Sequence, residues 1–119
     1  MTLGCEKNEH DFQQAVNQLQ GDCELFRLFA DAFVGGYEQW LKDVKNAFSE
    51  NHHDELKRLI HTYKGFAGQI GALSLTILLT NTYRKVIAGE GLLPDELENI
   101  HQEIERTVKA LCHFLHGLE

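Results

Sequence analysis

The sequence predicts an all-α fold, an antiparallel four-helix bundle with one short additional helix before it. Apolar residues recur at steps of three and four along most of the chain, which is the helical period. No segment shows the period-two alternation that is typical of a strand. The expected helices are joined by short connections, as in antiparallel bundles. The length of 119 residues and the single proline, Pro94, favour one domain over residues 1–119.

The first two helices are expected at residues 11–19 and 22–48. Asp22 is a suitable N-cap, because its short side chain can accept a hydrogen bond from the first turn. Gly35 and Gly36 are a weak point of the second helix, which we expect to continue through them, with any bend located there. Its apolar face is formed by seven side chains: Phe26, Phe29, Phe33, Tyr37, Trp40, Val44 and Phe48.

Three further helices complete the expected bundle. The third begins between residues 52 and 54, and the fourth covers about residues 72–88. The run Gly-Glu-Gly at 89–91 ends the fourth helix. Pro94 then lies in the first turn of the fifth helix, where proline is tolerated. Acidic residues in this first turn suit the helix dipole: Asp95, Glu96 and Glu98.

Composition and charge limit the classes of function. Hydrophobic residues make up 43% of the chain, an ordinary value for a soluble globular protein. The formal net charge of −7 argues against nucleic acid and anionic membranes as partners, since both attract basic proteins. No apolar run approaches the length of about 20 residues that a membrane-spanning helix needs. The first ten residues lack the apolar middle of a signal peptide. We therefore expect a cytoplasmic protein without direct membrane contact.

Metal binding is not expected. The cysteines are widely spaced and form no Cys-x-x-Cys pair: Cys5, Cys23 and Cys112. We expect free thiols, with the second and third cysteine as packing residues. Two histidine pairs occur without cysteines at zinc-finger spacing: His52–His53 and His113–His116. No acidic cluster has the pattern of a Mg²⁺ site either.

His61 lies on the outer face of the third helix. At about 100° per residue, six apolar side chains share an arc of about 120°: Leu56, Leu59, Ile60, Tyr63, Phe66 and Ala67. His61 lies about 160° from the centre of that arc. Lys57, Lys64, Gly65 and Gly68 are on the same side as His61. The histidine is therefore predicted to be exposed, between two lysines and beside bare backbone.

These residue types suit the transfer of a phosphoryl group. A neutral imidazole is a good nucleophile near neutral pH, because its unperturbed pKa is about 6.5. Gly65, one turn after His61, leaves room beside the ring, and Lys64 supplies a flexible positive charge for an anion. Gly68 and Gly71 are expected to let the chain leave the helix and turn back.

The segment from His61 to Ala72, HTYKGFAGQIGA, resembles the signature of histidine-containing phosphotransfer (HPt) domains. In that signature a histidine is followed by Lys-Gly, then Ala-Gly and Gly-Ala. The runs GDCELFRLFADAF and RKVIAGEG are also similar to family segments, so the likeness covers nearly the whole chain. The resemblance implies that His61 is phosphorylated, that Lys64 lies beside the phosphate and that Gly65 keeps access open.

The resemblance also implies a role in signalling. His61 would accept a phosphoryl group from the aspartyl phosphate of a response-regulator receiver domain and pass it to another receiver. The chain would be a monomeric carrier rather than an enzyme, with no cofactor of its own and with Mg²⁺ on the receiver. A hybrid sensor histidine kinase is a further expected partner. The alternative is a helical adaptor of the same fold that binds receivers or kinases without carrying phosphate.

The chain departs from the family pattern at three positions. Tyr63 replaces a usual leucine, which we expect to be a neutral change in the core, and Phe66 replaces a small residue. On the fourth helix, relatives often place a glutamine facing the histidine, and counting without gaps puts Tyr83 there. Tyr83 and Gln69 are the candidate partners of the imidazole or phosphate. Two more residues are candidates for docking, with the long second helix contributing: Lys57 and Gly68.

Overall fold

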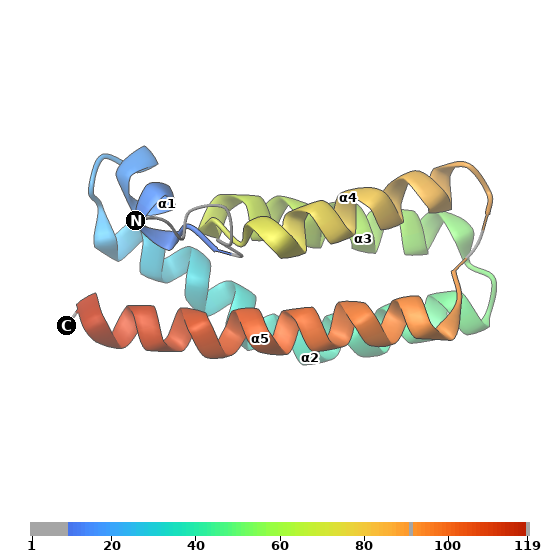
Figure 1. The fold of residues 1–119 in the computed structure, drawn as a ribbon. Helices are drawn as coiled ribbons and strands as arrows, with labels where there is room; N and C mark the ends of the chain where they lie inside the picture. The colour runs from blue at the N-terminus through green and yellow to red at the C-terminus, as the bar shows by residue number, and fades with distance from the viewer. Residues whose placement is uncertain (1–9, 91, 119) are drawn as a thin grey trace, which may run out of the picture.

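The computed structural model describes residues 10–90 and 92–118, and this part of the chain is all-α (Figure 1). Five helices follow one another: α1 (Phe12–Gln18), α2 (Cys23–Ser49), α3 (His53–Ile70), α4 (Leu73–Ile87) and α5 (Pro94–Leu118). No described residue lies in a strand, and the all-α prediction is confirmed. The predicted boundaries agree with these helices to within one residue wherever the sequence predicts both ends.

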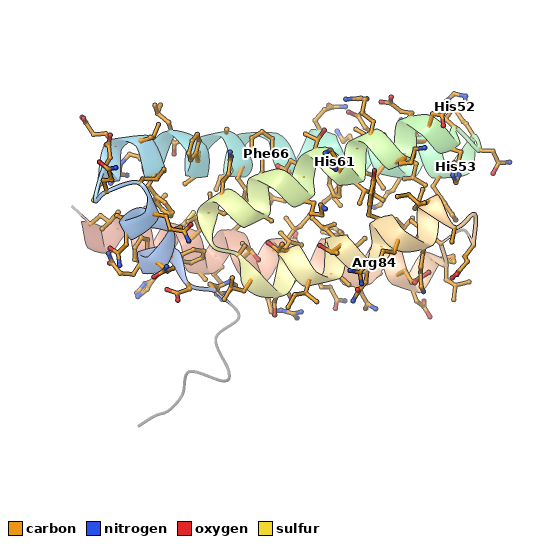
Figure 2. All side chains as sticks on the ribbon, turned by 90° about the horizontal axis from the view of Figure 1, so that it is seen from above. His52, His53, His61, Phe66 and Arg84 are labelled. Carbon is orange, nitrogen blue, oxygen red and sulfur yellow. The ribbon has the colours of Figure 1, made fainter. Side chains whose placement is uncertain are left out.

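The four long helices lie side by side, and each contacts two others. α3 contacts α2 and α4, and α5 also contacts α2 and α4. Seen from above, α3 lies between α2 and α4 (Figure 2). The short α1 lies at the end of the molecule where α3 turns into α4 (Figure 1). The largest fully buried side chains come from all four long helices.

Local signals explain where the first helices begin. The Asp22 carboxylate accepts a hydrogen bond from the backbone N–H of Leu25 at 3.0 Å, as predicted for an N-cap. Asp11 caps α1 in the same way, by accepting from the backbone N–H of Gln14 at 3.1 Å. α2 is one continuous helix through Gly35.

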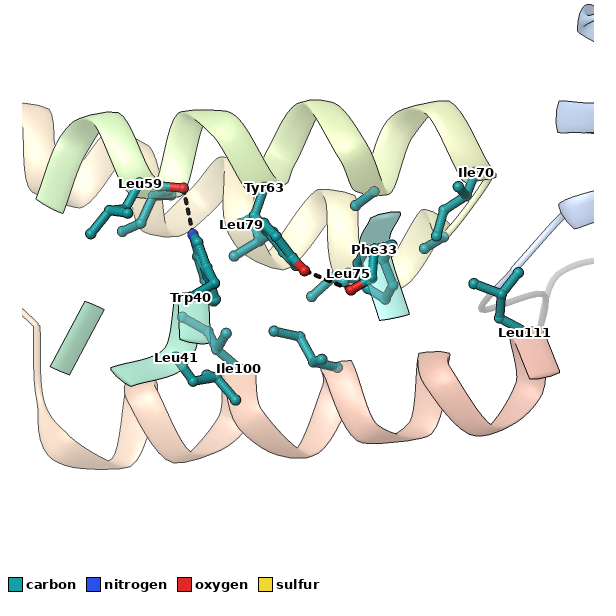
Figure 3. Packing of buried hydrophobic residues seen from close by; sticks show 14 of the residues in the cluster. Phe33, Trp40, Leu41, Leu59, Tyr63, Ile70, Leu75, Leu79, Ile100 and Leu111 are labelled. Atoms are coloured by element: carbon teal, nitrogen blue, oxygen red, sulfur yellow. Dashed lines mark hydrogen bonds between the residues drawn. The ribbon is translucent and has the colours of Figure 1, made fainter. Parts of the chain in front are cut away.

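Two hydrogen bonds join α2 to α3 across the core (Figure 3). The Trp40 indole N–H donates to the carbonyl oxygen of Leu59 at 2.7 Å, and the Tyr63 hydroxyl donates to that of Phe33 at 2.7 Å. The Tyr63 ring also stacks against Trp40 and Phe33, with ring centroids 4.6 and 5.2 Å apart. Burial raises the pKa of the Tyr63 hydroxyl far above its usual range, so this group remains a donor.

The expected position of Tyr63 in the core is confirmed, but the tyrosine does more there than a leucine would. Its hydroxyl is a cross-helix donor that leucine lacks. The expectation that Cys23 and Cys112 are packing residues is wrong, because both thiols are free and exposed. Cys5 lies outside the described residues.

Gly71 ends α3 and makes the turn into α4. Its φ of +80° is in the left-handed region, and a Cβ added there would lie 2.4 Å from the backbone oxygen of Asp11. The Gly71 carbonyl accepts a hydrogen bond from the Asp11 N–H at 2.7 Å. The backbone N–H of Ala72 donates to the carbonyl of Ala67, as in a Schellman motif. Gly68 lies inside α3, so the expectation that its conformational freedom helps the turn is wrong.

The start of α5 is held to α4 through Glu96. Its carboxylate accepts from the backbone N–H of Leu93 at 2.8 Å and forms an ion pair with Lys85 of α4. This glutamate occupies the third position of the helix and reaches back toward its start, as in a capping box. The Lys85 hydrogen bond, followed by the Leu93 N–H, holds the pKa of Glu96 below its usual value.

We predict that Gly71→Ala destabilises the protein more than Gly21→Ala does. Both glycines have φ of +80°, but only Gly71 has atoms that an added Cβ would meet. Backbone strain should cost each variant about 1–2 kcal/mol, and the close approach of Asp11 should cost Gly71→Ala about 1–3 kcal/mol more. Urea unfolding measures the free energy of unfolding of both variants. Equal losses in the two variants would show that the contact with Asp11 is unimportant.

We also predict a pH-dependent contribution from Glu96. Because its pKa is lowered on folding, the group stabilises the native state above its unfolded pKa of about 4.5. That stability is lost as the pH falls through the folded pKa. Glu96→Gln should therefore lower the free energy of unfolding at about pH 7, with the difference shrinking toward about pH 3. Glu98→Gln is the control, because Glu98 bonds to the Gln102 amide instead of a cation. A Glu96→Gln deficit that is constant with pH would contradict this account.

Candidate functional site

His61 lies near the middle of α3, with its side chain exposed (Figure 2). The flanking Ile60 is fully buried, so the helix turns its core face inward directly beside the histidine. Leu59 and Tyr63, two residues to either side, take part in the hydrogen bonds with α2. The imidazole is thus presented outward from a helix segment whose inner side is fixed.

Tyr83 of α4 lies against the His61 ring. The two ring centroids are 5.5 Å apart, and the ring planes are tilted by 41°. The described hydrogen bonds include none between these two side chains, so the contact is aromatic. Tyr83 is half-buried and packs against the core, which leaves it little freedom to move away from the histidine.

Lys64 completes the group. Its Nζ atom lies 5.4 Å from the centroid of the Tyr83 ring, a cation–π distance. Among residues 10–90 and 92–118, no carboxylate forms an ion pair with Lys64. Lys57 differs, because its Nζ lies 3.8 Å from a carboxylate oxygen of Asp54. An anion arriving at His61 therefore meets an uncompensated ammonium group on Lys64 but not on Lys57.

The turn at Gly71 explains why Tyr83 and His61 meet. His61 is eleven residues before Ala72, and Tyr83 is eleven residues after it. Two helices joined by a tight turn run back along each other, so residues at equal distances from the turn lie at the same height. Both residues therefore lie about 16 Å along the helix axes from the turn, at 1.5 Å of rise per residue.

Gly65 leaves the surface beside His61 open. A Cβ added at Gly65 or at Gly68 would meet no neighbouring heavy atom within 4 Å. Gly65 is therefore not at a close helix–helix contact within the described residues. Packing does not require glycine at either position.

Other predicted residues lie further from the imidazole. Gln69 is eight residues after His61, which is about 12 Å along the helix axis, so α3 does not bring it beside the ring. Phe66 is half-buried and makes an edge contact with Tyr63, with ring centroids 5.6 Å apart. The bulky residue is therefore accommodated by packing against the core.

Residues 56–89 carry a charge pattern that the sequence-based predictions did not include. This segment of α3 and α4 contains no Asp or Glu, although the whole chain carries 18 acidic residues. Three of its cations pair with carboxylates of flanking segments: Lys57, Arg58 and Lys85. Lys64 and Arg84 have no ion-pair partner in the described part of the chain. The pattern is visible in the sequence but is hidden when only the net charge is considered.

The other described histidines do not form a second candidate site. His52 lies 3.5 Å from a carboxylate oxygen of Glu50 at the start of α3. Within the ranges that the structure describes, no group of three or more His, Cys, Asp or Glu side chains could hold a metal ion.

No protein-family model matches the chain, and no solved structure matches it significantly. In the described part of the chain, no helix has the length and apolar character needed to cross a membrane. A functional assignment therefore depends on the sequence around His61 and on the arrangement of His61, Lys64, Gly65 and Tyr83.

Proposed function

We propose that the chain is a histidine phosphotransfer module of a two-component phosphorelay. In this proposal the four long helices form the antiparallel four-helix bundle of HPt domains, and His61 carries the phosphoryl group. The observation that carries the proposal is an exposed histidine on a fixed helix, beside an uncompensated lysine and open backbone. The resemblance of HTYKGFAGQIGA to the family signature supports the same assignment.

The proposed reaction is an in-line transfer from a receiver aspartyl phosphate. The lone pair of Nε2 on neutral His61 attacks phosphorus while Nδ1 keeps its proton. The N–P bond forms as the P–O bond breaks, and the electron pair of that bond leaves on the aspartate carboxylate. Transfer of this kind depends mainly on positioning and on neutralising charge, and Lys64 supplies a positive group over the Tyr83 ring, which contacts His61.

The partner completes the active site in this proposal. The receiver domain brings the aspartate and the Mg²⁺, whereas this chain supplies the nucleophile, the lysine and a docking surface. The carrier is proposed to be monomeric and cytoplasmic, and to exchange phosphate between receivers, one of which belongs to a hybrid sensor histidine kinase. Binding should be transient, because a relay requires release after each transfer.

We predict that His61 is the only residue to become labelled. Wild type incubated with Mg²⁺ and a radiolabelled, phosphorylated receiver should gain acid-labile, base-stable label, and His61→Gln should gain none. His53→Gln is the matched control, because His53 is an exposed histidine of the same helix. Labelling of His61→Gln at the wild-type level would overturn the proposal. Receiver binding with no label on wild type would instead favour the adaptor.

A second prediction separates access from stability at Gly65. Gly65→Ala and Gly35→Ala each replace an exposed helical glycine that has no neighbour within 4 Å of an added Cβ. Both should raise the free energy of unfolding by about 0.5–1 kcal/mol, because alanine favours the helix. Only Gly65→Ala should slow the transfer, by about tenfold, because its methyl group displaces the approaching phosphoryl group. Equal transfer rates for the two variants would remove Gly65 from the site.

A further inference from the structure

The outer face of α4 carries exposed apolar side chains in one line. Leu73, Ile77 and Ile87 are 42%, 63% and 55% exposed. With Thr80 and Arg84 they are spaced by four, three, four and three residues, which places all five on one stripe of the helix. We call these five residues the outer stripe of α4.

The fold itself does not use this stripe. α4 turns a different face into the core, and that face is formed by four buried side chains: Leu75, Leu79, Thr82 and Val86. Apolar side chains that recur along an exposed helix face are typical of a surface that binds a partner. Single exposed apolar residues need no such explanation, but here three lie on one face of one helix, with Thr80 and Arg84 between the second and the third.

Charge indicates the chemistry of the partner. α4 contains no acidic residue, and Arg84 has no ion-pair partner among the residues that the structure describes. On the other side of α3, α2 has three exposed acidic residues: Glu24, Asp31 and Glu38. α2 also carries two exposed lysines, Lys42 and Lys45, so its charge is mixed, whereas both charged residues of α4 are basic. An anionic partner is therefore favoured at α4 over α2.

The outer stripe lies within reach of a protein that covers His61. Tyr83, which contacts the His61 ring, is on α4 about 9 Å along the axis from Ile77 and about 6 Å from Ile87. A standard protein interface covers about 800 Å² on each partner, a patch of about 16 Å radius. A protein centred on His61 and leaning toward α4 therefore covers Ile77, Arg84 and Ile87, whereas Leu73 lies about 15 Å along the axis from Tyr83, at the edge of such a patch.

We propose that the outer stripe of α4 is the docking surface for the phosphorylated receiver that exchanges its phosphoryl group with His61. The receiver presents an apolar patch flanked by carboxylates, so that the apolar residues are buried and Arg84 is neutralised. This inference rests on the proposed function and differs from the expectation that α2 contributes to docking. In this inference α4 selects the partner, and α3 carries the histidine that accepts the phosphoryl group.

The experiment compares two phosphodonors. Phosphoramidate is small and needs no docking surface, whereas a phosphorylated receiver with Mg²⁺ does. Ile77→Ser/Ile87→Ser should be labelled by phosphoramidate at the wild-type rate, yet transfer from a panel of purified receivers should be slowed about tenfold or more. Leu28→Ser on α2 is the control, because Leu28 is 65% exposed, close to the 63% of Ile77. Circular dichroism checks that each variant remains folded.

Three outcomes would overturn the inference. Unchanged transfer from every receiver would show that the stripe is not used. Slower labelling by both donors would show that the substitutions act on His61 itself. A wild-type dimer in sedimentation that the double substitution dissociates would show that a second copy of the chain covers the stripe.

Failure of the proposed function is recognised separately. If neither donor labels wild type, His61 is not a phosphoryl acceptor under these conditions. Docking is then read from the backbone amide signals of α4 in NMR spectra recorded with each receiver. Shifts that the double substitution abolishes support docking without transfer, and the absence of shifts overturns it.

Discussion

Gly71 is the point at which three segments of the chain meet. Its left-handed backbone ends α3, its missing side chain lets the backbone of Asp11 approach, and its carbonyl accepts the N–H of that residue. The turn makes α4 run back along α3 in a fixed register. That register places Tyr83 beside His61, so the composition of the site depends on a residue about 16 Å away from it.

The same helix is held from its other side by α2. The hydrogen bonds of Trp40 and Tyr63 connect α2 and α3 directly behind the histidine. In the proposed function, the His61 nucleophile loses little freedom when it reacts, because its backbone is already ordered. Rigidity at the inner side and bare backbone at the outer side of α3 are therefore complementary features of one helix.

Much of the fold and of the site can be predicted because the signals are local. Helical period, the Asp22 cap and the outward position of His61 follow from neighbouring residues alone, and Tyr83 follows from counting across one tight turn. The hydroxyl bond of Tyr63 cannot be predicted, because it depends on the separation between two helices. Residue type alone suggests packing for Cys23 and Cys112, but it does not say which face of the helix meets the core.

The two hydrogen bonds between α2 and α3 end on main-chain oxygens, and this affects how the protein can change during evolution. Every residue type carries a carbonyl, so substitutions at Phe33 and Leu59 alter packing but leave both acceptors in place. The donors are different, because few side chains combine a long aromatic body with a polar hydrogen. Positions 40 and 63 should therefore drift slowly among descendants of this chain, while the residues that supply the oxygens are free to vary in size.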